Sequence, residues 1–60
     1  MFVKLTDYRD GKALYLNANM VSGIWEDRGI TYVYSADGLV CEVEESAQTA
    51  VKMMEKEVED

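Results

Sequence analysis

The stretch 46–60, SAQTAVKMMEKEVED, decides the fold class, because helical periodicity is clearest there. Its apolar residues recur three or four positions apart, as they do on one face of an α-helix; they are Ala47, Ala50, Val51, Met54 and Val58. Ser46 precedes this stripe and is a good N-cap, since its hydroxyl can accept from the first unpaired amides of the helix. We therefore expect a helix over residues 46–58, whose apolar stripe has to be buried against another layer.

Residues 1–45 contain the short apolar runs that can supply that layer. Each run either alternates apolar with polar side chains or is rich in β-branched and aromatic residues, and together they cover residues 2–6, 13–17, 21–26, 30–34 and 39–43. Turn signals with glycine separate several of them, at 10–11, 28–29 and 37–38. The sequence predicts an α+β fold in one domain, residues 1–60. A small antiparallel sheet of four to five short strands (1–45) precedes one amphipathic helix (46–58), which packs on one face.

Two irregularities interrupt the strand pattern. Asn17-Ala18-Asn19 favours a turn or a single helical turn, because asparagine is poor inside strands and good at caps. Val21 and Ile24 are three positions apart, so they share a strand face only if a bulge lies between them, and Ser22-Gly23 is a plausible place for it.

The two faces of the predicted sheet differ in character. The face toward the helix would carry Val3, Leu5, Leu14, Leu16, Ile24, Val33, Cys41 and Val43, with Leu39 alternating in the same direction as Cys41. The opposite face would carry Phe2, Tyr15, Trp25, Tyr32, Tyr34 and Val40. One helix cannot cover both faces, so the second set would form a larger exposed apolar patch than small monomers usually show.

Three interpretations of this aromatic patch compete. Tyrosine and tryptophan tolerate water on a half-exposed sheet. They can also pack against another copy of the chain, which we favour because a 60-residue chain buries only about 60% of its unfolded surface and association compensates for a small core. Stacking of nucleobases is the third interpretation, and the charge of the chain argues against it.

The net charge of −6 is concentrated in the C-terminal part. Residues 1–36 hold four acids and four bases, whereas residues 37–60 hold eight acids and two bases. This balance argues strongly against direct binding of nucleic-acid phosphates, for which a basic face is expected. The acids can serve solubility, dock a basic protein partner, or mimic a nucleic acid.

The composition also argues against an enzyme. The chain has no histidine, and Cys41 alternates with apolar residues as a small core residue does. Glu26-Asp27 and Glu44-Glu45 are adjacent pairs, and neighbours on a strand point to opposite faces, so neither pair makes an acid/base dyad. We expect no catalytic site, no metal, no cofactor and no small-molecule substrate. The sequence has no apolar run long enough for a membrane span, no signal-peptide pattern and a single cysteine, so we expect a cytoplasmic protein.

The order of several short motifs resembles a known family. The motifs are Lys4-Leu5-Thr6, Gly11, Tyr15-Leu16-Asn17, Val21, Ile24, Gly38, Val43 and Glu45-Ser46, followed by an amphipathic helix. Together they resemble the FlbD-like (SwrD-like) small bacterial flagellar accessory proteins, over nearly the whole chain. The resemblance implies a non-enzymatic cytoplasmic accessory protein that supports the flagellar motor. Ala18 stands where the family usually has proline, and the C-terminal helix ends in acids where relatives often carry bases, so a partner bound at that end would differ.

Two functions from different classes follow. The first is a protein-interaction or accessory module that forms a homo-oligomer through the aromatic face. The alternative is a phage or mobile-element inhibitor that mimics nucleic acid with the acidic residues of 37–60.

Overall fold

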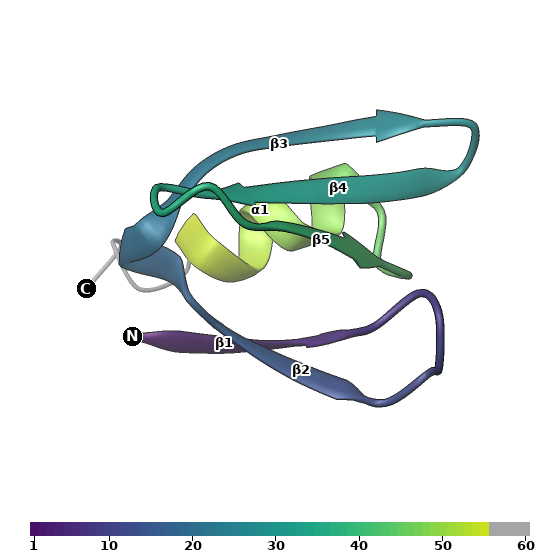
Figure 1. The fold of residues 1–60 in the computed structure, drawn as a ribbon, viewed down its shortest axis with the longest axis horizontal. Coiled ribbons are helices and arrows are strands. Elements are labelled where there is room, and N and C mark those ends of the chain that lie inside the picture. The colour runs from purple at the N-terminus through teal and green to yellow at the C-terminus, as the bar shows by residue number, and fades with distance from the viewer. Residues whose placement is uncertain (56–60) are drawn as a thin grey trace.

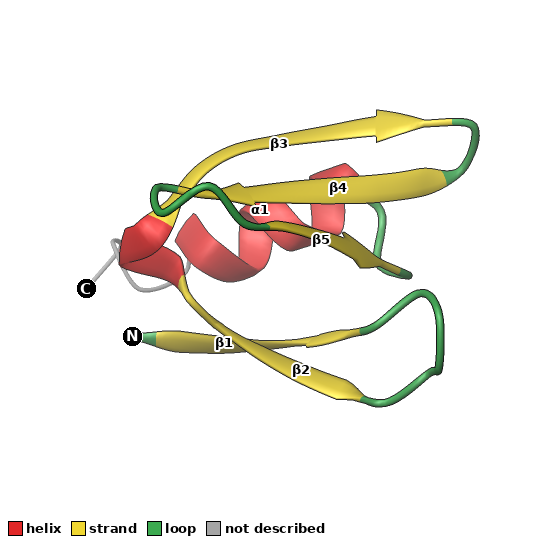
Figure 2. Ribbon diagram, viewed as in Figure 1, coloured by secondary structure: helices red, strands yellow, loops and turns green. Residues whose placement is uncertain are grey.

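The computed structural model describes residues 1–55, and it confirms the α+β class, with five strands followed by one helix (Figures 1 and 2). The strands are β1 (Phe2–Thr6), β2 (Ala13–Asn17), β3 (Val21–Asp27), β4 (Ile30–Ser35) and β5 (Val40–Val43). A single 3₁₀ turn, η1 (Ala18–Met20), links β2 to β3, and the final helix is α1 (Ala47–Glu55). The last three residues of the predicted helix, 56–58, lie outside the described residues.

The strands divide into two antiparallel sheets, β1-β2 and β3-β4-β5. The sheets meet at one corner, where Asp7 forms an isolated bridge with Val43. There the Tyr8 amide donates to the Glu42 carbonyl and the Glu44 amide donates to the Thr6 carbonyl, each over 2.9 Å. Beyond this corner β1 and β5 diverge, and α1 fills the space between the sheets, where it packs against β1 and β3 (Figure 1).

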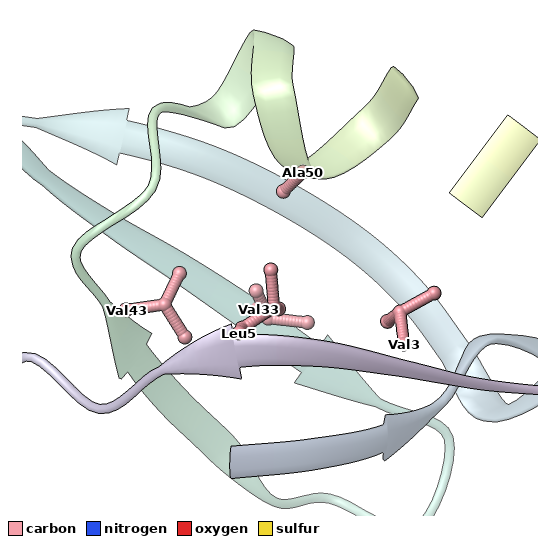
Figure 3. Packing of buried hydrophobic residues seen from close by; sticks show 5 residues of the cluster. All are labelled: Val3, Leu5, Val33, Val43 and Ala50. Carbon is pink, nitrogen blue, oxygen red and sulfur yellow. The ribbon is translucent and has the colours of Figure 1, made fainter. Parts of the chain in front are cut away.

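The core lies where the two sheets and the helix converge. Val3 and Leu5 come from β1, Val33 from β4, Val43 from β5 and Ala50 from α1 (Figure 3). All five are buried, and Leu5, Val43 and Ala50 are completely inaccessible to water. For the four strand residues, strict alternation produces this set, because every second residue of a strand points to the same face.

The other residues predicted to face the helix are only partly buried. Leu14, Leu16 and Ile24 pack against the edge of the core, and Cys41 is half-buried. The prediction that Leu39 faces the helix is wrong. Strand β5 begins one residue later, at Val40, and Leu39 is 62% exposed. It belongs to the turn after β4, where its carbonyl accepts a hydrogen bond from the Ser35 amide.

Both predicted irregularities are present. The Asn17 side chain accepts from the Asn19 amide at 3.0 Å and so caps the 3₁₀ turn. Between Val21 and Gly23 the pairing of β3 with β4 shifts register, which is the predicted bulge. The bulge lets Ile24 reach the helix side although Val21 lies three positions earlier.

The turn between β3 and β4 is a two-residue loop, because Asp27 pairs with Ile30. Arg28 and Gly29, its central residues, both have positive φ, 55° and 81°. A type I′ turn requires this backbone, and asparagine followed by glycine suits it best. Arg28 is therefore held in a conformation that its side chain disfavours.

Replacing Arg28 with asparagine is predicted to raise the free energy of unfolding by about 0.5–1 kcal/mol, because asparagine tolerates the left-handed region. Urea unfolding followed by circular dichroism measures the change. Arg28→Ala is the matched control, since it removes the same charge and keeps the backbone strain. Equal stability of the two variants would contradict the account of this turn.

Candidate interaction surface

The outer face of β3-β4-β5 carries the aromatic residues in two cross-strand rows. Trp25 pairs with Tyr32 of β4, which in turn pairs with Glu42 of β5. In the next row Tyr34 pairs with Val40 and lies opposite Gly23. We call Trp25, Tyr32, Tyr34 and Val40 the aromatic face.

The rings on this face contact one another. Trp25 lies nearly parallel to Tyr32, with ring centroids 5.5 Å apart and planes at 22°. It meets Tyr34 edge to face, at 4.4 Å and 71°. These are favourable aromatic geometries, which hold the rings in place without a covering layer.

The aromatic face is open to water. Trp25 remains 42% exposed and Tyr34 40% exposed, because α1 packs on the opposite side of the sheet. Tyr32 is half-buried beside Trp25, and Val40, also exposed, extends the apolar patch; contiguous apolar patches of this kind often mark interaction sites.

The structure brings together four of the six residues predicted for the aromatic patch. Phe2 and Tyr15 lie on the separate β1-β2 sheet, where they are 65% and 62% exposed. They face outward beside Lys4, which pairs with Tyr15. The sequence indicated which side of each strand faces out, but the division into two sheets depends on long-range pairing that alternation does not encode.

A second apolar surface lies between β3 and α1, and the sequence did not indicate it. It is an open groove lined mainly by small and aliphatic residues: Ala18, Val21, Ser22, Gly23, Ile24, Val51, Met54 and Glu55. Val51 was expected within the buried stripe of the helix, yet it is exposed at this groove. The helix covers the inner side of β3 incompletely, and this leaves the groove.

Two glutamates tie the start of α1 to the sheets. Glu26 of β3 accepts from the Ala47 amide at 3.1 Å, and Ser46 accepts from the Thr49 amide at 3.1 Å as the expected N-cap. Glu45 binds the end of β1 with both oxygens: Oε1 accepts from the Thr6 amide at 2.9 Å and Oε2 from the Thr6 hydroxyl at 2.8 Å. These contacts join residues far apart in sequence, so no local motif predicted them.

The hydrogen bonds to Glu45 affect its pKa. Partial burial by itself would raise the pKa of this carboxyl, but the bonds from the amide and hydroxyl of Thr6, together with the backbone of Glu45 itself, outweigh burial and lower the pKa below the usual glutamate range. The carboxylate therefore stabilises the fold at neutral pH.

Side chains that could bind a metal or take part in catalysis are dispersed over the described part of the chain. No group of three or more histidine, cysteine or carboxylate side chains within residues 1–55 could hold a metal ion. The acids of 37–55 are likewise spread over a turn, the outer sheet face, the helix start and the groove, while Glu57, Glu59 and Asp60 lie outside the described residues. Over residues 1–55, no helix has the length and apolarity needed to cross a membrane.

No family model matches this chain, and no curated protein and no solved structure matches it.

Replacing Glu45 with glutamine is predicted to lower the free energy of unfolding at pH 7 by about 1 kcal/mol, toward the low end for a charged hydrogen bond because Glu45 is half-exposed. Since the folded-state pKa is lowered, this stabilisation is present above the ordinary glutamate range and is lost as the pH falls through the folded-state value. The difference between wild type and Glu45→Gln should therefore shrink as the pH falls below the ordinary glutamate range. Urea unfolding across pH measures it, with exposed Glu44→Gln as control. A difference independent of pH would contradict the proposed bond.

Proposed function

We propose that the chain is a non-enzymatic protein-interaction module that self-associates through the aromatic face. The observation that carries the proposal is the contact cluster of Trp25, Tyr32 and Tyr34 on a sheet face that no described element covers. Tryptophan and tyrosine are the residues most often dominant in protein interfaces.

The size of the chain supports this use of the face. A 60-residue domain has a small core, and here only five hydrophobic residues are fully buried among those described. Covering the aromatic face would remove further apolar surface from water, worth about 25 cal/mol per Å² before the costs of association. Leu39 and Val40, exposed at the start of β5, extend the apolar surface beyond the rings.

The rigid arrangement of the face supports the proposal as well. Each ring is fixed by its neighbours and by a regular strand, so little side-chain freedom is lost on association. Burial of already ordered aromatic rings is an efficient source of binding free energy.

The flagellar accessory role remains a prediction that rests on the motif resemblance. An interaction module of this kind is compatible with such a role, but it does not depend on it. The alternative, a nucleic-acid mimic, would need the acids of 37–60 gathered on one surface. Glu45 is engaged with Thr6, and the acids described are dispersed, so the aromatic face is the better-supported site.

Trp25→Asp is predicted to convert oligomers to monomers, because it places a charge at the centre of the buried contact. Light scattering measures the solution mass, which for the wild type should be a multiple of the 6.8 kDa monomer. Tyr15→Asp is the matched control, since it makes the same change at an exposed aromatic residue on the other sheet.

Circular dichroism should show that both variants are folded. If Trp25→Asp unfolds the chain, Tyr34→Ser provides the milder change at the same face. Strictly monomeric wild-type protein, or equal effects of Trp25→Asp and Tyr15→Asp on mass, would refute self-association through this face.

A further inference from the structure

The charged residues on the outer face of β3-β4-β5 are all acidic. By register, the outward positions are Gly23, Trp25 and Asp27 on β3, Ile30, Tyr32 and Tyr34 on β4, and Val40 and Glu42 on β5. Glu42 lies directly opposite Tyr32, which places its side chain beside the ring because cross-strand neighbours are about 5 Å apart at Cβ. Within residues 1–55, the carboxylates of Asp27 and Glu42 have neither a hydrogen bond nor an ion pair.

The described bases lie elsewhere. Lys4 is on the β1-β2 sheet, Lys12 lies in the connection between β1 and β2, Lys52 is on α1, and Arg9 pairs with Asp7 at 3.5 Å. Arg28 occupies the turn at the end of the sheet. The aromatic face thus combines exposed rings with carboxylates that have no cationic partner on the same face among residues 1–55.

We propose that the aromatic face binds an arginine side chain of a basic protein partner, with the guanidinium stacked on the face of Tyr32 that Trp25 leaves free and paired with Glu42. This inference rests on the proposed role of the face in protein interaction, and it names the chemistry of a partner other than a second copy. The basic partner and the second copy use one surface, so they compete.

Ring geometry favours arginine over other cations. Trp25 is stacked on one face of Tyr32, with the planes at 22°. Because Tyr32 lies between Trp25 and Glu42 in the cross-strand row, its other face is turned toward Glu42, where a planar guanidinium can stack. Arginine can also bind the neighbouring carboxylate with two parallel hydrogen bonds, which lysine cannot. A methylated ammonium group would need a hollow between perpendicular rings, but Trp25 and Tyr34 are already in contact at 4.4 Å.

The same charges give the two modes of binding opposite responses to salt. Two copies that meet through this face bring their Asp27 and Glu42 carboxylates together, so screening by salt favours self-association. An arginine partner is attracted by those carboxylates, so salt weakens its binding. Raising NaCl from about 0.05 M to about 0.5 M shortens the screening length severalfold. It should therefore weaken binding of the arginine partner and strengthen self-association.

Trp25 is the single tryptophan, so its fluorescence reports directly on the site. The experiment titrates the full chain with a Gly-Ser peptide that contains three arginines, and with a matched peptide that contains three lysines. We expect a saturable change in Trp25 fluorescence with the arginine peptide, at least about twofold weaker binding of the lysine peptide, and loss of affinity at high salt. Glu42→Gln should weaken arginine binding about two- to fivefold, the range for an exposed charge pair, whereas Glu44→Gln should leave it unchanged.

Light scattering of the same samples separates the two proposals. Wild-type oligomers that dissociate as arginine peptide is added support both. Peptide binding by a protein that is monomeric throughout supports arginine recognition and refutes self-association. Equal binding of the arginine and lysine peptides, or equal effects of Glu42→Gln and Glu44→Gln, overturns the arginine site. If Glu42→Gln fails to fold, the comparison of the two peptides at low and high salt decides alone.

Discussion

The single C-terminal helix determines what the rest of the molecule exposes. α1 is nine residues long, and it fits into the space between two small sheets with Ala50 completely buried against the core (Figure 3). It therefore covers inner faces only. The outer sides of β3, β4 and β5 have no second layer among the described residues, and these sides carry the rings of Trp25, Tyr32 and Tyr34. The candidate interaction surface follows from this shortage of helices.

Two carboxylates hold the start of α1 against the two sheets. Glu45 joins the start of the helix to the end of β1, and Glu26 joins it to β3. Each carboxylate accepts from backbone amides that would otherwise be unpaired near the helix start or the strand end. Glu26 and Glu45 thus have a structural role, whereas Asp27 and Glu42 lie on the outer side of the sheet beside the aromatic face.

Local sequence patterns predicted the individual strands and the helix well. How the strands are grouped into sheets depends on contacts between residues far apart in the sequence, which these patterns did not predict. The bounds of β1 and β2 follow from strict alternation, and the bulge before Ile24 follows from two apolar residues three positions apart. The split into two sheets depends on where the end of β1 meets β5, 36 residues later at the Asp7–Val43 bridge, and no short motif encodes that pairing. For the same reason the sequence grouped Phe2 and Tyr15 with Trp25, and it did not indicate the groove between β3 and α1.

The most direct test of the account is how readily acrylamide quenches Trp25 fluorescence at increasing protein concentration. Trp25 is 42% exposed in the single chain, so quenching should be efficient in dilute solution. If the aromatic face is the surface of association, quenching should fall severalfold as the concentration rises, because the ring becomes buried between copies. Quenching that stays equally efficient across the whole concentration range would contradict the account.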